Sequence, residues 1–349
     1  MAHDPKREDY QRLVLRMAHE LEENENEDVV RSFSTFGMRF AQDRESLPQS
    51  DSDRAFNLVA LATEAIDYEL PFATGERAET LVEQAHSELT EALALDPNCF
   101  DAARMLSSYN VDSVETRYRW LAENEETVRA YCEAERDKLS KEAESERLEM
   151  AQNLAMRPYW RWLASMAEEA LICGRNRETI QIARRALESD PHDMSDVRFT
   201  LAYALAKLED DAGFEELERN YSKISPLRSS NDAWMGIARV ALAYKRCNFV
   251  EAHTQLSRLL ESYPGAGYCL ILQSELPDGE FARLNVRPYT EDEMVLAVSE
   301  GIVLFQEGVD RSGKGVFGAW IASETARLDP QAAARAYGDD SDSEEASGL

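Results

Sequence analysis

Apolar residues recur three and four positions apart along almost the whole chain, which is the spacing of one face of an α-helix. After Pro158, for example, Tyr159, Leu163 and Met166 keep this spacing. Pro158 suits the first turn of that helix and Gly174 suits its C-terminal cap. No comparable run alternates apolar and polar residues with the period of a strand. The sequence therefore predicts an all-α protein.

The same periodicity places the other helices. It predicts helices at residues 7–22, 27–42, 53–68 and 76–95, six between residues 158 and 264, one that opens at a Thr290–Glu293 capping box, and one at residues 316–328. Only 15 Gly and 11 Pro occur in 349 residues, which favours long regular elements. Gly338–Leu349 carries five acidic residues and no basic one, so we expect a disordered tail there.

Charge limits the partners of this chain. Acidic residues outnumber basic ones 67 to 38, which gives a formal net charge of −29. This balance disfavours nucleic acids and anionic membranes, and it favours proteins or peptides with basic patches. No stretch reaches the length of a membrane-spanning helix, and the polar N-terminus does not resemble a signal peptide. The five cysteines form no CxxC pair, so we expect reduced thiols and a cytoplasmic protein without metal or cofactor.

Three segments end in a proline and align with one another. They are Ala92-Leu-Ala-Leu-Asp-Pro97, Ala186-Leu-Glu-Ser-Asp-Pro191 and Leu259-Leu-Glu-Ser-Tyr-Pro264. Small residues let paired helices approach closely, and each proline ends the second helix of a pair. The distance from Pro191 to Pro264 is about two units of a repeat of roughly 34 residues. The pattern indicates stacked antiparallel helix pairs.

These segments, together with Arg157-Pro-Tyr and Gly174-Arg175, resemble the tetratricopeptide repeat superfamily. They are similar in particular to bacterial tetratricopeptide-like proteins and to the suppression-of-tumorigenicity family. Ala167 and Val240 stand where the superfamily usually has a glycine, and the units are irregular in length. The resemblance implies an α-solenoid whose concave surface binds a protein or a peptide.

The sequence divides into four regions. Residues 1–112 form an N-terminal helical region with one repeat-like unit, residues 113–156 a long charged helical segment, residues 157–335 the repeat region, and residues 336–349 the acidic tail. Eleven of the eighteen residues in Glu133–Met150 are charged. This pattern is typical of a solvated helix stabilised by neighbouring opposite charges. The alternative is a projecting arm that pairs with another chain and makes a homo-oligomer.

Two segments offer an enzymatic alternative. Gly308–Lys314 matches the front of a phosphate-binding loop, but Gly315 stands where the loop needs Ser or Thr, and the segment joins two expected helices. A flexible turn explains it better. The Asp190–Asp196 cluster, which includes His192, lacks the glycine and the distal glutamate of a calcium loop. We expect these acids to cap the next helix.

Two further residue types invite a chemical interpretation. Glu83 and His86 lie three positions apart, as paired metal ligands do on a helix, but the chain lacks the second such motif of a di-iron bundle. We therefore expect His86 on a helix surface. Cys173 has no histidine near it in sequence, so we expect a packed thiol rather than a nucleophile.

Aromatic and basic residues cluster from residue 157 to residue 162. We expect Tyr159 and Trp162 in the core, whereas Arg157, Trp160 and Arg161 are the candidate partner-binding residues of an exposed patch. The sequence predicts a non-enzymatic scaffold for protein–protein or protein–peptide interaction. The alternative is a nucleotide- or metal-dependent enzyme that uses the Gly308–Lys314 turn or the Asp190–Asp196 cluster.

Overall fold

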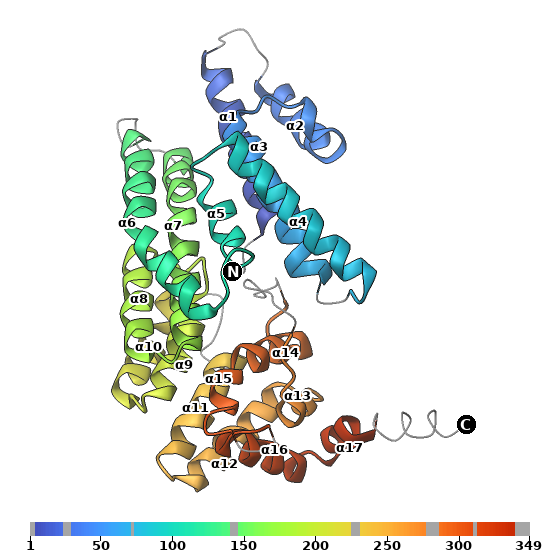
Figure 1. Ribbon diagram of the computed structural model, residues 1–349, viewed down its shortest axis with the longest axis vertical. Coiled ribbons are helices and arrows are strands. Elements are labelled where there is room, and N and C mark those ends of the chain that lie inside the picture. Colours follow the sequence, from blue (N-terminus) through green and yellow to red (C-terminus); the bar gives the residue numbers. More distant parts are fainter. Residues whose placement is uncertain are drawn as a thin grey trace, which may run out of the picture. The chain divides into compact units, whose positions relative to one another are not determined.

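The computed structural model describes residues 4–23, 29–70, 73–139, 146–224, 231–276, 286–309 and 313–338. Every regular element in these ranges is a helix, which confirms the predicted all-α class (Figure 1). The chain forms two compact units, one of residues 3–163 and one of residues 164–349 with residues 1–2. The division falls within the helix Glu146–Ile172.

The unit of residues 3–163 is built around α3. Its elements are α1 (Pro5–Glu23), α2 (Val29–Gln42), the 3₁₀ turn η1 (Arg44–Ser46), α3 (Asp51–Thr63), the π-helical η2 (Glu64–Glu69), α4 (Glu76–Leu95), α5 (Phe100–Leu106), α6 (Val114–Leu139) and the first part of α7 (Glu146–Ile172). α3 packs against α1, α4 and α5, with Phe56 and Val59 buried. A capping box opens α3, because the Asp53 N–H donates to Ser50 Oγ at 3.2 Å and the Ser50 N–H donates to the Asp53 carboxylate at 2.8 Å.

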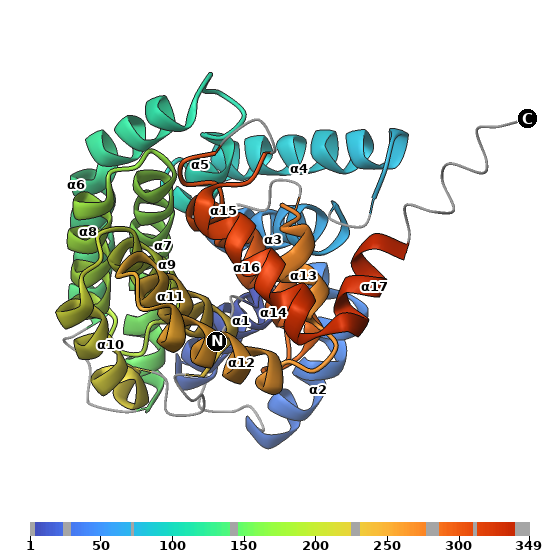
Figure 2. The same cartoon turned by 90° about the horizontal axis from the view of Figure 1, so that it is seen from below.

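The other unit contains the end of α7 and ten further helices among the described residues. They are α8 (Asn176–Ser189), α9 (Val197–Lys207), α10 (Asp211–Ile224), α11 (Ala233–Lys245), α12 (Phe249–Ser262), α13 (Gly267–Leu272), α14 (Glu291–Glu300), α15 (Ile302–Phe305), α16 (Val316–Leu328) and α17 (Pro330–Gly338). α9 packs against α8, α10 and α11, and α11 packs in turn against α12, α14 and α16. Side chains on all sides of α9 and α11 are buried, so these two helices form the centre of the unit. α13 lies beside α16 and α17 (Figure 2).

One type of helix end recurs. α4, α8 and α12 end two residues before Pro97, Pro191 and Pro264, which confirms the predicted helix ends, and α16 ends in the same way before Pro330. The residue before each proline leaves the helical conformation, with φ between −136° and −127°. In three of the four, an aspartate accepts the backbone N–H two residues later: Asp96 from Asn98 at 2.9 Å, Asp190 from His192 at 3.2 Å and Asp329 from Gln331 at 3.1 Å. The Asp-Pro sequence thus recurs with the same local backbone structure.

Of the two predicted ends of α7, the structure confirms one and differs at the other. Gly174 does cap α7 with φ +74°, the Gly174 N–H donating to Leu171 O and the Arg175 N–H to Ala170 O. Pro158, however, lies inside α7 rather than in its first turn. Buried side chains upstream of the proline, among them Leu154 and Met156, continue the packed face of this helix.

The Thr290 capping box is incomplete. Thr290 is the N-cap of α14, but its hydroxyl donates to Arg287 O instead of accepting a helix N–H. The Glu293 carboxylate accepts the Tyr289 N–H, one residue further back than the predicted box requires. The predicted start of the helix is therefore right, and its predicted capping bonds are wrong.

α17 extends to Gly338, so residues 336–338 of the expected disordered tail are helical instead, and the rest of that tail, residues 339–349, lies outside the described residues. Residues 140–145 of the predicted charged segment also lie outside them. None of the described helices is long and apolar enough to cross a membrane.

Candidate functional site

The three predicted partner-binding residues lie on α7, but they do not form an exposed patch. Trp160 is 7% exposed and Arg161 is 6% exposed, and the Arg157 side chain is also largely buried. Tyr159 and Trp162 are in the core, as predicted, and the Trp162 indole donates to Leu121 O on α6 at 3.0 Å. The prediction of an exposed aromatic and basic surface here is wrong, because these arginines face carboxylates from other helices.

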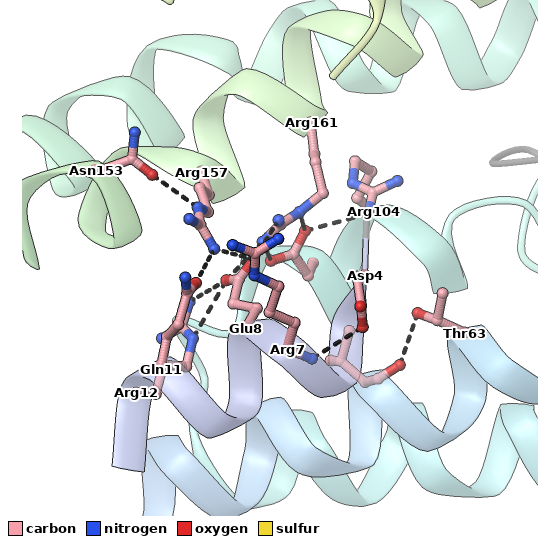
Figure 3. Close-up of polar contacts among 12 residues, drawn as sticks. Asp4, Arg7, Glu8, Gln11, Arg12, Thr63, Arg104, Asn153, Arg157 and Arg161 are labelled. Carbon is pink, nitrogen blue, oxygen red and sulfur yellow. Dashed lines mark hydrogen bonds and ion pairs between the residues drawn. The ribbon is translucent and has the colours of Figure 1, made fainter. Parts of the chain in front are cut away.

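Those carboxylates are Glu8 of α1, which is labelled with Arg157 and Arg161 in Figure 3, and Asp101 of α5. Arg161 forms ion pairs with Glu8 at 2.9 Å and with Asp101 at 2.6 Å. Arg157 lies 3.2 Å from Glu8 and also donates to Gln11 at 2.9 Å. The ion-pair cluster therefore joins the N-terminal helix to α5 and α7 within one compact unit.

The charges in this cluster stabilise one another. Burial raises the pKa of Asp101, but the guanidinium groups of Arg161 and Arg104 outweigh burial and hold that pKa well below its ordinary value. For Arg104, burial and the neighbouring positive charge of Arg161 lower the pKa to about 10. Asp101 and Arg104 therefore both stay charged near neutral pH. This behaviour fits a structural ion-pair cluster rather than a general acid or base.

The Asp190–Asp196 cluster caps α9, as predicted. Asp193 accepts the backbone N–H groups of Val197 at 2.7 Å and Arg198 at 3.1 Å. The Arg198 guanidinium, which is fully buried, pairs with Asp193 at 2.8 Å and with Asp196 at 2.7 Å. No three His, Cys, Asp or Glu side chains in the described ranges are arranged to hold a metal ion.

The Gly308–Lys314 turn also has structural contacts, and residues 310–312 within it lie outside the described part. The Lys314 ammonium donates to the backbone carbonyl of Ile271, and burial lowers the pKa of this lysine. Gly315 stands where a phosphate-binding loop has Ser or Thr, and a Cβ there would lie 2.2 Å from Glu307 O. A side chain at residue 315 would therefore collide with the backbone at the end of α15.

The remaining reactive side chains show no special environment. Glu83 and His86 are both exposed, and the His86 ring contacts only the edge of Tyr109 among the ring contacts described, with centroids 5.3 Å apart. The five cysteines are free, and Cys173 is half-buried rather than fully packed. Burial raises the pKa of Cys99 and Cys132 to about 12 and that of Cys269 to about 11, so these three are protonated, weakly reactive thiols.

A different surface carries exposed aromatic and aliphatic side chains. We define the α11–α12–α16 patch as Tyr244, Phe249, Val250, Val316 and Trp320. Val250 is 82% exposed, Val316 67% and Phe249 50%, whereas Tyr244 and Trp320 are half-buried. The sequence assigned Phe249 to the apolar face of its helix, and the structure leaves half of it in solvent. Val250 lies outside the apolar face that the sequence predicts for this helix, and Tyr244, Val316 and Trp320 carry no sequence signal that separates them from core positions.

Tyr244 of α11 contacts α12 and α16 at the α11–α12–α16 patch. Its ring centroid lies 4.9 Å from that of Trp320 and 5.6 Å from that of Phe249, and its hydroxyl donates to Val316 O at 3.3 Å. Beneath the patch, the buried Phe317 ring lies 5.3 Å from Tyr244 and stacks on Phe305. The exposed rings are thus fixed to the core of their unit.

Comparison of the chain with protein-family models, with curated proteins and with solved structures finds no match.

Proposed function

We propose that this chain is a non-enzymatic helical-repeat scaffold that binds protein or peptide partners in the cytoplasm. The observation that carries the proposal is the recurrent helix end, in which α4, α8 and α16 stop at the same Asp-Pro turn. A repeated helix end is typical of an array of helix pairs, such as the tetratricopeptide-like solenoid that the sequence resembles. Such arrays present long surfaces to other proteins.

The charged side chains that could otherwise serve catalysis or bind a ligand have structural roles, which supports this proposal. Asp101, Asp193 and Arg198 are engaged in ion pairs and helix caps, and Lys314 is bonded to a backbone carbonyl. These contacts tie the helices to one another. The net charge of −29 adds long-range attraction for partners with basic surfaces.

Affinity capture tests the proposal. The tagged full-length chain is incubated with native lysate at low and at raised salt, and the captured proteins are identified by mass spectrometry. We expect a discrete partner with a basic surface that is released as salt is raised, because salt screens charge attraction. The control is an unrelated tagged protein of similar negative charge. A capture profile identical to that of the control would contradict the scaffold function.

A further inference from the structure

The α11–α12–α16 patch combines exposed valines at the starts of α12 and α16 with a cluster of aromatic rings. Val250 and Val316 are among the most exposed large apolar residues in the described part of the chain. Tyr244 connects the two helix starts where these valines lie, since its ring packs against Phe249, the neighbour of Val250 in α12, and its hydroxyl donates to the backbone carbonyl of Val316 at the start of α16. Isolated exposed valines need no explanation, but exposed valines beside a cluster of aromatic rings are typical of an interaction site.

The patch is also preorganised. Tyr244 is held between Trp320 and Phe317, and Phe317 stacks on Phe305 in the core with ring centroids 5.7 Å apart. A partner that docks here orders few side chains, so little conformational entropy opposes binding. Rings fixed in this way are typical anchors of protein interfaces.

The basic side chains at the border are already engaged. Lys245 pairs with Glu307 at 2.9 Å, Arg246 pairs with Asp211 at 2.9 Å, and Lys314 donates to the Ile271 carbonyl. They therefore offer little to an acidic partner. The faces of the exposed aromatic rings attract Lys and Arg, and the net charge of −29 attracts the same residues over a longer distance.

We propose that the α11–α12–α16 patch docks a segment of a partner protein in which aromatic or aliphatic anchors are flanked by Lys and Arg. The inference rests on the proposed scaffold function and names the surface and the partner chemistry for it. A second copy of this chain fits less well, because two chains of charge −29 repel each other.

The test uses the full-length chain and two labelled synthetic peptides of about 15 residues, long enough to form a helix. One peptide combines Leu and Trp with Lys and Arg, and the other replaces every Lys and Arg with Glu. We expect the basic peptide to bind and the acidic one not to bind, by fluorescence anisotropy. The double variant Val250→Ser/Val316→Ser should raise the Kd for the basic peptide by at least about tenfold, because it removes two exposed anchors.

The matched control is Met38→Ser/Ile172→Ser, which removes similarly exposed apolar side chains (59% and 57%) from α2 and α7. It should bind the basic peptide as the unmodified chain does. Circular dichroism checks that both double variants keep their helical content, as expected for such exposed positions.

Three results would overturn the inference: no binding of the basic peptide, equal binding of the acidic peptide, or equal binding by Val250→Ser/Val316→Ser. Light scattering tests whether a second copy of the chain occupies the patch instead. A dimer of the unmodified chain that Val250→Ser/Val316→Ser abolishes would assign the patch to that second copy. If the unmodified chain and Val250→Ser/Val316→Ser capture the same partner equally well from lysate, the proposed docking role of the patch is wrong while the scaffold function stands. If the unmodified chain captures nothing beyond its control, the scaffold function itself fails.

Discussion

Asp101 holds two buried guanidinium groups, those of Arg161 and Arg104, at 2.6 and 3.1 Å. We predict that Asp101→Asn destabilises the unit of residues 3–163 by about 3 to 5 kcal/mol, because it leaves buried positive charge without its counter-ion. Urea unfolding followed by tryptophan fluorescence measures the change, since Trp120, Trp160 and Trp162 all belong to this unit. The control is Glu126→Gln, whose exposed carboxylate pairs with Arg129 on the surface of α6. It should leave the midpoint unchanged.

The pH dependence of this variant follows from the same geometry. The pKa of Asp101 is depressed in the folded state, so its contribution to stability is complete above the unfolded pKa of about 4. That contribution is lost as pH falls from about 4 toward the lower folded pKa. The stability difference between the unmodified chain and Asp101→Asn should therefore shrink below pH of about 4. A difference that stays constant with pH would show that the carboxylate charge is not what stabilises the cluster.

At the scale of elements, Gly318 sets how closely α16 approaches α15. A Cβ on Gly318 would lie 2.3 Å from Phe305 O, which is backbone and cannot rotate away. We predict that Gly318→Ala lowers the free energy of unfolding by about 1 to 3 kcal/mol. Gly37 of α2 is the matched control, because nothing lies within 4 Å of a Cβ there.

Gly37→Ala should instead stabilise the chain by about 0.5 to 1 kcal/mol, since alanine loses less backbone entropy in a helix. Urea denaturation of both variants measures whether each substitution lowers or raises the free energy of unfolding. A neutral Gly318→Ala would mean that α15 and α16 are not packed as closely as described.

At the scale of the whole molecule, the formal charge of −29 repels itself. We predict that raising NaCl from about 10 mM to about 150 mM raises the urea midpoint, because the Debye length falls from about 30 Å to about 8 Å and screens this repulsion. Urea is the required denaturant, since guanidinium chloride would itself supply salt. A falling midpoint would show that surface ion pairs such as Arg129 with Glu126 outweigh the net repulsion.

The elements themselves were largely predictable from sequence. α4 spans Glu76–Leu95 and α16 spans Val316–Leu328, as the periodicity predicts, and helices stop before Pro97, Pro191 and Pro264. These features depend on side chains within one or two turns of each other, so a local pattern contains the needed information. The capping role of the Asp190–Asp196 cluster was predictable for the same reason.

The functional surface was not predictable in this way. Arg157 and Arg161 look like exposed basic residues in sequence. They are buried in the structure, where both form ion pairs with Glu8 of α1, about 150 residues earlier in the chain. Val250 and Val316 are 82% and 67% exposed, and the apolar spacing of the sequence does not reveal this exposure. The spacing of apolar residues says that a face is apolar, but it does not say what that face meets.

The sequence by itself determined the all-α class, most helix boundaries and the negative charge, because each depends on composition or on neighbours along the chain. Tertiary structure alone decided which charges are buried as pairs and which apolar side chains stay in water. Burial and pairing depend on residues that are distant in sequence and meet only when the helices pack. The α11–α12–α16 patch, drawn from three helices, exists only at that level.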